Sequence, residues 1–477
     1  MDPVKLTVKE VRLFEREVRL RLPFRFGVVT LTEAPQAYAR VRVALEDGRE
    51  GWGMAAEMLA PKWFDKNTDL SNEQNFDQLR RALGMAREAY LAAGATTAFG
   101  LMAGSHRSLM EQGRAAALNP LLTGYGPALL DRAVLDALCR LHDTSFERAL
   151  QADLPGIEPA ALAPELRGFP FASFLQGLRT AETIHARHTV GMTDPLTASD
   201  RPAAERVNDG LLETLEEVVA AYGNRYFKVK VRGEAAADQE RLRAIAAVLD
   251  QIPEPYFVTL DGNEQFHEVE GVLELVARIE EEPRLRRFWE AVLFIEQPVH
   301  RAEALAHDFR PLAEKRPVII DESDGDFDAF PLAREKGYEG VSSKSCKGFY
   351  KSLVNAARCA LWNEEAGRLR FFMSGEDLTC IAGLTLQQDL LLASFLGLTH
   401  LERNGHHYVR GMAAAPPAEQ ERFAAAHPDL YRFEEGAALL RVERGEIRLG
   451  SLACPGFGSA AEPDWSSLRE MTVPRGA

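Results

Sequence analysis

The sequence has few cysteines and no long hydrophobic run. Its 477 residues include five cysteines, an odd number, and no Cys-x-x-Cys pair. A disulfide framework or a Cys-rich zinc site is therefore not expected, and a cytoplasmic location with reduced thiols is the simpler prediction. No stretch reaches the roughly 18 apolar residues that a membrane-spanning helix needs. The N-terminal segment lacks an apolar core, so no signal peptide is expected.

The sequence also has fewer basic than acidic residues. Lysine and arginine total 56 against 71 aspartate and glutamate residues, which gives a formal net charge of −15. A chain with this balance does not attract a phosphate backbone over long range, so nucleic acid is not an expected partner. The hydrophobic fraction of 46% is ordinary for a globular protein and is sufficient for a large core.

The first part of the chain changes character once. Residues 4–60 alternate between apolar and polar positions and contain an Asp-Gly turn at Asp47-Gly48, which predicts antiparallel strands. Residues 72–165 have apolar residues at helical spacing. This order predicts an α+β domain over residues 1–175.

A second pattern begins near residue 180. Short apolar segments recur, and each is followed by a helical stretch. The predicted strands are residues 183–191, 226–231, 256–263, 292–298, 317–323, 338–345, 370–375 and 398–405. Eight βα units close most naturally into a TIM-type (β/α)8 barrel, predicted over residues 176–411. The tail, residues 412–477, has irregular and β-like segments and is expected to return to the first domain, forming a capping domain with it.

Three carboxylates stand at the ends of consecutive predicted strands. Asp261, Glu296 and Asp321 each follow an apolar run, and active sites of such barrels lie at these strand ends. Any one of them alone is typically a capping or salt-bridge residue, and that alternative stays open for the trio. Three buried carboxylates on adjacent strands would repel one another without a cation. Oxygen ligands without His or Cys indicate Mg²⁺, and Mn²⁺ also fits.

Three lysines accompany these carboxylates. Lys228 and Lys230 are two residues apart, so both point to the same face of their strand. A Lys-x-Lys pair is common on surface strands, but the apolar residues around it indicate a buried strand. Lys344 lies on the sixth strand, across the barrel from the second, and can face Lys230. Lys347 is expected to contact an anion or the backbone near a helix start.

These motifs, in this order, resemble the enolase superfamily in its mandelate racemase/muconate lactonizing enzyme branch, with a muconate-cycloisomerase-like lysine–lysine site. The matching segments are KVK at 228–230, LDGN at 260–263, IEQP at 295–298, IIDES at 319–323, SSKSCKG at 342–348, FRFG at 24–27 and GWG at 51–53. The resemblance implies that Asp261, Glu296 and Asp321 bind one Mg²⁺. It implies an acid/base pair, Lys230 and Lys344, with electrostatic support from Lys228.

The resemblance also implies a reaction class. A small carboxylate substrate would lose the proton next to its carboxylate and pass through an enediolate. Racemisation or epimerisation, cycloisomerisation and β-elimination all remain open, because two bases permit each of them. A homo-oligomer is expected by the same resemblance. Ser342 and Phe349 depart from the usual motif, which leaves the substrate open. The predicted substrate-binding residues are Asn263, Glu322, Glu376, His406 and Phe26.

Other functions fit parts of the pattern. A sugar-acid dehydratase of the same superfamily would use a His–Asp dyad on strands seven and six, but strand seven ends MSGEDLT without a histidine. A barrel that only binds a metal and a carboxylate would normally lack a ligand or a base, and none is missing. An aldolase-type barrel would need a single Schiff-base lysine and no carboxylate trio. Substrate selection is expected from aromatic residues of the cap, among them Phe24 and Trp63.

Overall fold

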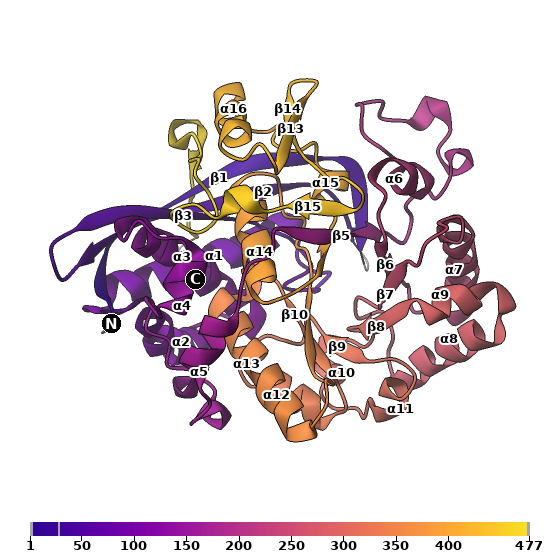
Figure 1. Ribbon diagram of the computed structural model, residues 1–477, viewed down its shortest axis with the longest axis horizontal. Helices are drawn as coiled ribbons and strands as arrows, with labels where there is room; N and C mark the ends of the chain where they lie inside the picture. Colours follow the sequence, from indigo (N-terminus) through magenta and orange to yellow (C-terminus); the bar gives the residue numbers. More distant parts are fainter. Residues whose placement is uncertain (1–2, 27–28, 475–477) are drawn as a thin grey trace.

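A computed structural model describes residues 3–26 and 29–474 of the chain, and its centre is a closed barrel (Figure 1). Eight parallel strands pair in chain order, and the last pairs with the first through Leu401 and Ala186. The strands are β5 (Thr183–Val190), β6 (Tyr226–Lys230), β7 (Phe257–Asp261), β8 (Val292–Glu296), β9 (Val318–Ile320), β10 (Gly340–Ser343), β11 (Phe372–Gly375) and β12 (His400–Arg403). The predicted (β/α)8 barrel is therefore confirmed.

Helices follow the barrel strands. They are α6 (Leu215–Tyr222), α7 (Ala235–Leu249), α8 (Val269–Glu281), α9 (Arg286–Glu290), α10 (Arg301–Ala304), α11 (Arg310–Ala313), α12 (Ala329–Glu335), α13 (Phe349–Ala366), α14 (Leu384–Phe395) and α15 (Gly405–Tyr408). Helix α8 shows why they pack there: Val272, Val276 and Ile279 form an apolar stripe that is buried against the barrel. Helix α6 begins with a capping box between Thr214 and Glu217.

The N-terminal segment forms a separate antiparallel sheet covered by helices. Strands β1 (Lys5–Phe26), β2 (Val29–Leu45) and β3 (Glu50–Met58) pair in order, and β4 (Thr96–Thr97) adds to β1. The helices are α1 (Asn72–Ala92), α2 (Ala98–Ala115), α3 (Pro120–Leu141), α4 (Phe146–Gln151) and α5 (Phe171–Gly177). Helix α3 packs so closely on β3 that a Cβ at Gly53 would lie 2.0 Å from the carbonyl oxygen of Ala133. Glycine at this position is therefore a packing requirement.

The tail contacts both parts of the molecule. It contains α16 (Pro417–Ala426), β13 (Tyr431–Glu434), β14 (Ala437–Leu440), β15 (Glu446–Arg448) and β16 (Arg469–Glu470). Strand β15 pairs with β5 of the barrel, whereas β16 pairs with β1 of the N-terminal sheet. Figure 1 shows this yellow segment beside the indigo strands. The predicted domain division at residues 175 and 411 stays a prediction.

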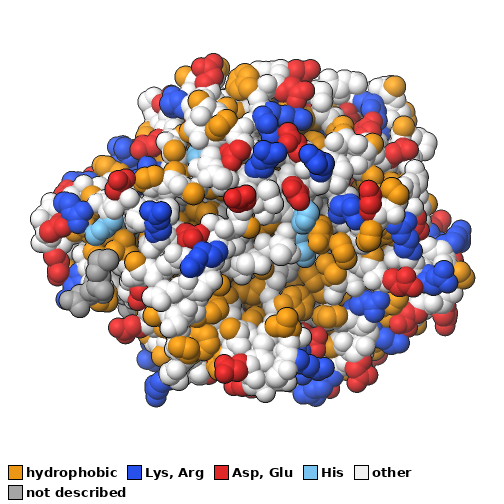
Figure 2. All heavy atoms as spheres, in the orientation of Figure 1, with side chains coloured by type: hydrophobic (Ala, Val, Ile, Leu, Met, Phe, Trp, Pro, Cys, Tyr) orange, Lys and Arg blue, Asp and Glu red, His pale blue; other side chains and the backbone are white. Residues whose placement is uncertain are grey.

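Eight short 3₁₀ helices complete the described chain. They are η1 (Pro159–Ala161), η2 (Pro164–Leu166), η3 (Ala198–Asp200), η4 (Ala203–Glu205), η5 (Pro283–Leu285), η6 (Ser345–Lys347), η7 (Gly450–Leu452) and η8 (Trp465–Ser467). Among the described helices none is long and apolar enough to cross a membrane. Figure 2 shows acidic and basic side chains mixed over one face of the molecule. Other charged side chains, among them Lys228, Asp261 and Glu296, are buried.

Candidate active site

The strand register brings three predicted site residues to one level. Lys230 pairs with Asp261 across β6 and β7, and Asp261 pairs with Glu296 across β7 and β8. Residues at one level of neighbouring parallel strands point to the same face of a sheet, which here is the barrel interior. Asp321 directly follows β9, and Lys344 directly follows β10. The predicted metal and lysine residues therefore all lie at the carboxyl ends of the strands.

Lys228 is the centre of a buried group of carboxylates. Its Nζ lies 3.0 Å from Asp261 Oδ2, and it donates hydrogen bonds to three glutamates. The acceptors are Glu296 Oε1 at 2.9 Å, Glu376 Oε2 at 2.6 Å and Glu402 Oε2 at 2.9 Å. We call Lys228 with Asp261, Glu296, Glu376 and Glu402 the Lys228 group. Although burial lowers the pKa of Lys228, Asp261 and Glu296 raise it well above the ordinary lysine value.

The carboxylates of this site differ in their preferred charge. Burial, and then the neighbouring Asp261 and Glu376, raise the pKa of Glu296 well above its usual range. Burial also acts on Asp321, but Lys344 and Lys347 outweigh it and hold the pKa of Asp321 well below the usual value. Burial raises the pKa of Glu322 to about 7, with Asp321 as the next cause. The region near Glu296 and Glu322 therefore has an excess of negative potential.

Lys230 and Lys344 face one pocket from different strands. Lys230 Nζ lies 2.7 Å from Asp261 Oδ2, and Lys344 Nζ lies 2.6 Å from Asp321 Oδ2. The pocket has about 410 Å³ of space that no atom fills. Its lining residues are Phe24, Leu31, Ala60, Trp63, Lys228, Lys230, Asn263, Lys344, Asp377, Leu378, Thr379, Glu402 and Asn404. The N-terminal domain thus closes the pocket above the lysines, as the sequence predicted for Phe24 and Trp63.

A cap residue lies directly on one of the lysines. Lys344 Nζ is 4.2 Å from the centre of the Trp63 ring, which is a cation–π contact. The backbone of this cap segment is held by Arg301, which donates to the carbonyl oxygens of Trp63 at 2.7 Å and Phe64 at 2.9 Å. Glu264 binds the same guanidinium through both of its oxygens. The barrel itself therefore positions Trp63.

The remaining predicted residues lie in three places. Asn263 and Glu322 are adjacent, with 3.3 Å between Asn263 Nδ2 and Glu322 Oε1. The backbone N–H of Asn263 donates a hydrogen bond to Asp261 Oδ1. Glu376 binds Lys228 and also accepts from Arg187 and Ser374. His406 lines a different pocket, where its ring contacts His188 and Tyr222. The side chain of Phe26 lies outside the described part of the structure.

The sequence interpretation missed Glu402. It stands in β12 between Leu401 and Arg403, and His400 and Thr399 come before Leu401, so the pattern that selected the other carboxylates, an acid after an apolar run, does not select it. Its oxygens accept hydrogen bonds from Lys228, Thr189 and Asp377 N. It also lines the pocket with the lysines. Glu402 is therefore part of the candidate site.

The residues present fit a hard divalent cation. In the described part of the structure, Glu322 Oε2 and Asn263 Oδ1 are buried oxygens without a hydrogen-bond partner, and Glu296 Oε2 accepts no hydrogen bond although it lies 2.8 Å from Lys228 Nζ. Such unsatisfied acceptors are costly in a protein interior, and a cation that accepts oxygen ligands would satisfy them. The raised pKa of Glu296 points the same way, because a nearby cation would favour its charged form. That Asp261, Glu296 and Asp321 hold such a cation together stays a prediction; of the three, Glu296 contributes one of these oxygens.

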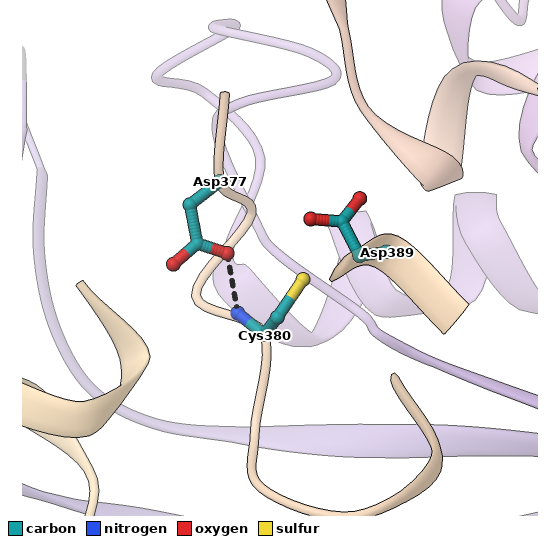
Figure 3. A group of neighbouring side chains, drawn as sticks. All are labelled: Asp377, Cys380 and Asp389. Atoms are coloured by element: carbon teal, nitrogen blue, oxygen red, sulfur yellow. Dashed lines mark hydrogen bonds between the residues drawn. The ribbon is translucent and has the colours of Figure 1, made fainter. Parts of the chain in front are cut away.

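A second acidic group has a different character (Figure 3). Asp377, Cys380 and Asp389 each offer one atom that could bind a metal ion, and these three atoms lie within 4.8 Å of one another. Arg403 Nη2 lies 2.5 Å from Asp389 Oδ2 and 3.6 Å from Asp377 Oδ1. Burial raises the pKa of the Cys380 thiol well above its ordinary value. This arrangement is an ion pair with an inert thiol.

Solved structures resemble the chain over nearly its whole length. A mandelate racemase/muconate lactonizing protein from Herpetosiphon aurantiacus is 17% identical, with a TM-score of 0.59 over 96% of this chain and 99% of that one. The fold is that of these enzymes. A dipeptide epimerase from Enterococcus faecalis, in complex with Mg and the dipeptide L-Leu-L-Tyr, is 14% identical, with a TM-score of 0.59 over 95% and 99% of the chains.

A third structure, an enolase from Bradyrhizobium in complex with magnesium and mandelic acid, is 18% identical. Its TM-score is 0.57, and the alignment covers 97% of each chain. No family model matches the sequence, and no curated protein sequence matches it. The structural likeness confirms the capped barrel that the motifs predicted.

Proposed function

We propose that the protein is a Mg²⁺-dependent enzyme that removes and returns the proton next to a substrate carboxylate. The observation that carries the proposal is the placement of Lys230 and Lys344. They reach one capped pocket from β6 and from the end of β10, and each is bound to a different carboxylate of the Asp261, Glu296 and Asp321 set. This is the lysine–lysine arrangement that the motifs resemble.

We assign each of these side chains a separate role in the proposed reaction. Lys230 and Lys344 would each transfer a proton on one side of the substrate α-carbon. Asp261, Glu296 and Asp321 would hold Mg²⁺, which when bound stabilises negative charge on the substrate carboxylate. Lys228 is not assigned as the base, because four carboxylates surround its ammonium. It instead fixes the positions of Glu296, Glu376 and Glu402. Against the effect of burial, Asp321 also raises the pKa of Lys344, so Lys344 is the acid of the pair unless the charge of Asp321 is compensated.

Racemisation or epimerisation is the favoured outcome, because a second lysine allows the proton to return on the opposite face. The solved structures with this fold include complexes with a dipeptide and with mandelic acid, so dipeptides and 2-hydroxy acids are the first substrate candidates. Cycloisomerisation and β-elimination use the same first step and remain alternatives. Trp63 and Phe24, which close the pocket, favour a substrate with an apolar group beyond its carboxylate.

Deuterium exchange tests this proposal without knowledge of the product. The protein with Mg²⁺ in D₂O is incubated with dipeptides, N-acyl amino acids, mandelate, succinylbenzoate-type acids and sugar acids, and loss of the α-proton is followed by NMR. Exchange of at least one class is expected. It should disappear with EDTA and in the double variant Lys230→Ala/Lys344→Ala, and persist in Lys315→Ala, whose lysine is an exposed partner of Glu280. Exchange that survives in the double variant would contradict the proposal.

A further inference from the structure

A loop of the N-terminal domain, residues 59–71, joins strand β3 to helix α1 and reaches the candidate active site. We call it the cap loop. Trp63 and Phe64 at its inner end are buried, whereas residues 67–69 at its outer end are exposed. Trp63 lies on Lys344, and both residues line the same pocket. The position of the cap loop therefore decides what surrounds one of the two lysines.

Hydrogen bonds close the cap loop on itself. Lys62 Nζ donates to the Asn67 carbonyl oxygen at 2.7 Å and also to the Leu70 carbonyl oxygen. Asp65 accepts a hydrogen bond from the backbone N–H of Asn67 at 3.0 Å, and one from Gln78 of helix α1 at 2.8 Å. A surface loop that is braced in this way by its own side chains is expected to move as one body.

One barrel residue, Glu264, supports the inner end of the cap loop. It follows β7, and its side chain is fully buried. Its Oε1 accepts hydrogen bonds from Arg301 N at 2.7 Å and Arg301 Nε at 2.8 Å, and its Oε2 accepts one from Arg301 Nη2 at 2.8 Å. The same guanidinium donates to the carbonyl oxygens of Trp63 and Phe64. Glu264 therefore fixes the arginine that holds the backbone at Trp63.

The outer end of the cap loop binds the same carboxylate. Lys66 Nζ lies 2.5 Å from Glu264 Oε2 and donates to the Asn263 carbonyl oxygen at 2.6 Å. Burial opposes the charge of Glu264, but the hydrogen bond and the charge of Arg301, together with Lys66, hold its pKa at about 2. Glu264 is therefore ionised at any pH near neutrality, and both ends of the cap loop depend on this one negative charge.

The pocket is too narrow for a substrate while the cap loop is in this position. The centre of a water-sized sphere has about 30 Å³ in which to move inside it. One water needs roughly 10–15 Å³ of such space, so the closed pocket holds only about two waters. Ala60 and Trp63 line the pocket from the cap loop, whereas Phe24 and Leu31 belong to the paired strands β1 and β2. Displacement of the cap loop opens the pocket without breaking any strand pairing.

We propose that Glu264 is a positioning residue for the proposed reaction, because it holds the cap loop closed over the pocket and keeps Trp63 against Lys344. The loop opens when Lys66 leaves Glu264 and the loop carbonyl groups leave Arg301, and it closes over the substrate through the same contacts. The effect on the reaction rests on the proposed function. Closure of the loop is a property of the protein without substrate and can be measured separately.

Hydrogen–deuterium exchange of the full-length protein, read by mass spectrometry, measures loop closure. Glu264→Gln keeps the size of the side chain and removes its charge, and Lys66→Met removes the outer contact alone. The peptide that covers the cap loop should exchange at least about tenfold faster in both variants, because each loses a charged hydrogen bond. Glu280→Gln is the matched control, since Glu280 pairs with Lys315 at the surface, and it should exchange like the parent.

Steady-state kinetics with a substrate found in the α-proton exchange screen test the positioning role. A protein whose closed state is less populated has a proportionally weaker apparent affinity. Glu264→Gln and Lys66→Met should therefore raise KM about tenfold and change kcat by less than about threefold, because the closed complex keeps both lysines. A purely structural role predicts a different pattern, with a lower melting temperature and unchanged KM and kcat for the folded fraction.

Three results would overturn the proposal. Exchange of the cap-loop peptide at the parent's rate in both variants would show that Glu264 does not hold the loop closed. Faster exchange with an unchanged KM would show that closure does not affect the reaction. A loss of kcat without a rise in KM would place Glu264 in the chemical step instead.

Melting curves identify a variant that fails to fold. If Glu264→Gln no longer melts cooperatively, Lys66→Met decides, because it leaves the Glu264 pair with Arg301 intact. A parent protein that turns over no substrate would contradict the proposed function. The exchange rates of the cap-loop peptide would still decide whether Glu264 holds the loop closed.

Discussion

The Lys228 group and the Arg403 ion pair are both buried acidic clusters at the strand ends, but their oxygens are satisfied to different degrees. Around Arg403, every carboxylate oxygen of Asp377 and Asp389 accepts a hydrogen bond from the backbone or the guanidinium. Around Lys228, Glu296 Oε2 accepts no hydrogen bond although it lies 2.8 Å from Lys228 Nζ, and the nearby Glu322 Oε2 accepts none. In the first cluster the carboxylates are satisfied, and it is the donor Arg403 Nη1 that lacks a partner among the described residues; the second cluster offers further acceptors.

The comparison teaches that proximity of ligand-type atoms does not identify a cation site. Asp377, Cys380 and Asp389 are close together (Figure 3), yet the two carboxylates share the guanidinium of Arg403 and each of their oxygens already accepts a hydrogen bond. In the Lys228 group four carboxylates surround one ammonium, and the pKa of Glu296 is raised as a result of burial and of its acidic neighbours. Unused acceptors and unbalanced charge are the better criteria.

The largest expected effect comes from the two lysines that flank the pocket. Lys230→Ala and Lys344→Ala should each lower turnover by about 10²–10⁴-fold, because a placed general acid or base contributes that much. Each single variant should still exchange the α-proton of one enantiomer. Asp261 keeps Lys228 at 3.0 Å, and Asp321 keeps Lys347 at 3.7 Å, so both variants should stay folded. Steady-state kinetics beside melting curves check this; a large stability loss with full activity would indicate a structural role.

The next effect separates the two acidic clusters. Asp389→Asn should lower the free energy of unfolding by about 3–5 kcal/mol, because it weakens a buried pair with Arg403. Mg²⁺ should still stabilise the Asp389→Asn variant. Glu296→Gln should leave the stability without Mg²⁺ unchanged or higher, since it removes repulsion. It should lose the Mg²⁺ stabilisation, which for the parent is about 3 kcal/mol at 100 times the dissociation constant.

Melting curves of both variants, with and without Mg²⁺, provide the measurement. If Asp389→Asn loses the Mg²⁺ effect and Glu296→Gln keeps it, the two clusters have been assigned the wrong way round. An equal loss of the Mg²⁺ stabilisation in both variants would show that the two clusters do not act independently in binding Mg²⁺.

A histidine cluster tests whether unused polar atoms always mark a cation site. His188, His406 and His407 pack together at the end of β5 and in α15, and neither ring nitrogen of His406 has a partner among the described residues. Burial lowers the pKa of His188 to about 4 and those of His406 and His407 well below the usual value. These rings are therefore neutral, and the cluster carries no charge that would need compensation at neutral pH.

This cluster predicts a pH dependence of stability. Below pH 6.5 the unfolded chain binds protons that the folded chain resists, so stability falls as the pH drops from 6.5 to about 4. His188 alone should account for about 3 kcal/mol of this loss. Urea unfolding of His188→Gln should show a correspondingly flatter pH profile than the parent or than His267→Gln, whose histidine is exposed. A profile with the parent's slope would contradict the lowered pKa.

The smallest effect concerns the cap. Trp63→Ala removes the ring that lies on Lys344 and should lower kcat/KM by about tenfold, the worth of one cation–π contact in a partly desolvated site. Trp52→Ala is the control, because Trp52 makes the same type of contact with Arg40 on the N-terminal sheet, away from the pocket lining. Equal effects of the two substitutions on kcat/KM would show that Trp63 acts only through the stability of the cap.

Much of the site could be predicted because it depends on local pattern. The apolar runs before Asp261 and Glu296 place both acids at strand ends, and closure of eight parallel strands then aligns them in register. The same rule does not select Glu402, because Thr399 and His400 interrupt the apolar run before it. The strand bounds shifted by a few residues: β9 ends at Ile320 and β10 at Ser343, so Asp321 and Lys344 lie just beyond their strands. This shift leaves their side chains at the same barrel mouth.

Other features depended on contacts between distant parts of the chain. Trp63 reaches Lys344 only because Arg301 and Glu264 hold its backbone, and no local pattern encodes that meeting. His406 stands at a strand end like the acids, yet the chain turns into α15 and directs its ring toward His188 instead. Sequence position alone therefore places a residue near the barrel mouth but does not fix which pocket it enters.

The sequence by itself determined the barrel, its capping sheet and the polar residues at the strand ends, because hydrophobic periodicity and strand order are local properties. Only the tertiary structure decided which of these polar atoms are satisfied. Both carboxylate oxygens of Asp389 accept hydrogen bonds, one of them from Arg403, whereas Glu322 Oε2 and Asn263 Oδ1 have no hydrogen-bond partner among the described residues. The reason is physical: the charge state and hydrogen bonding of a buried group depend on every neighbour within a few ångströms, and those neighbours come from strands far apart in the chain.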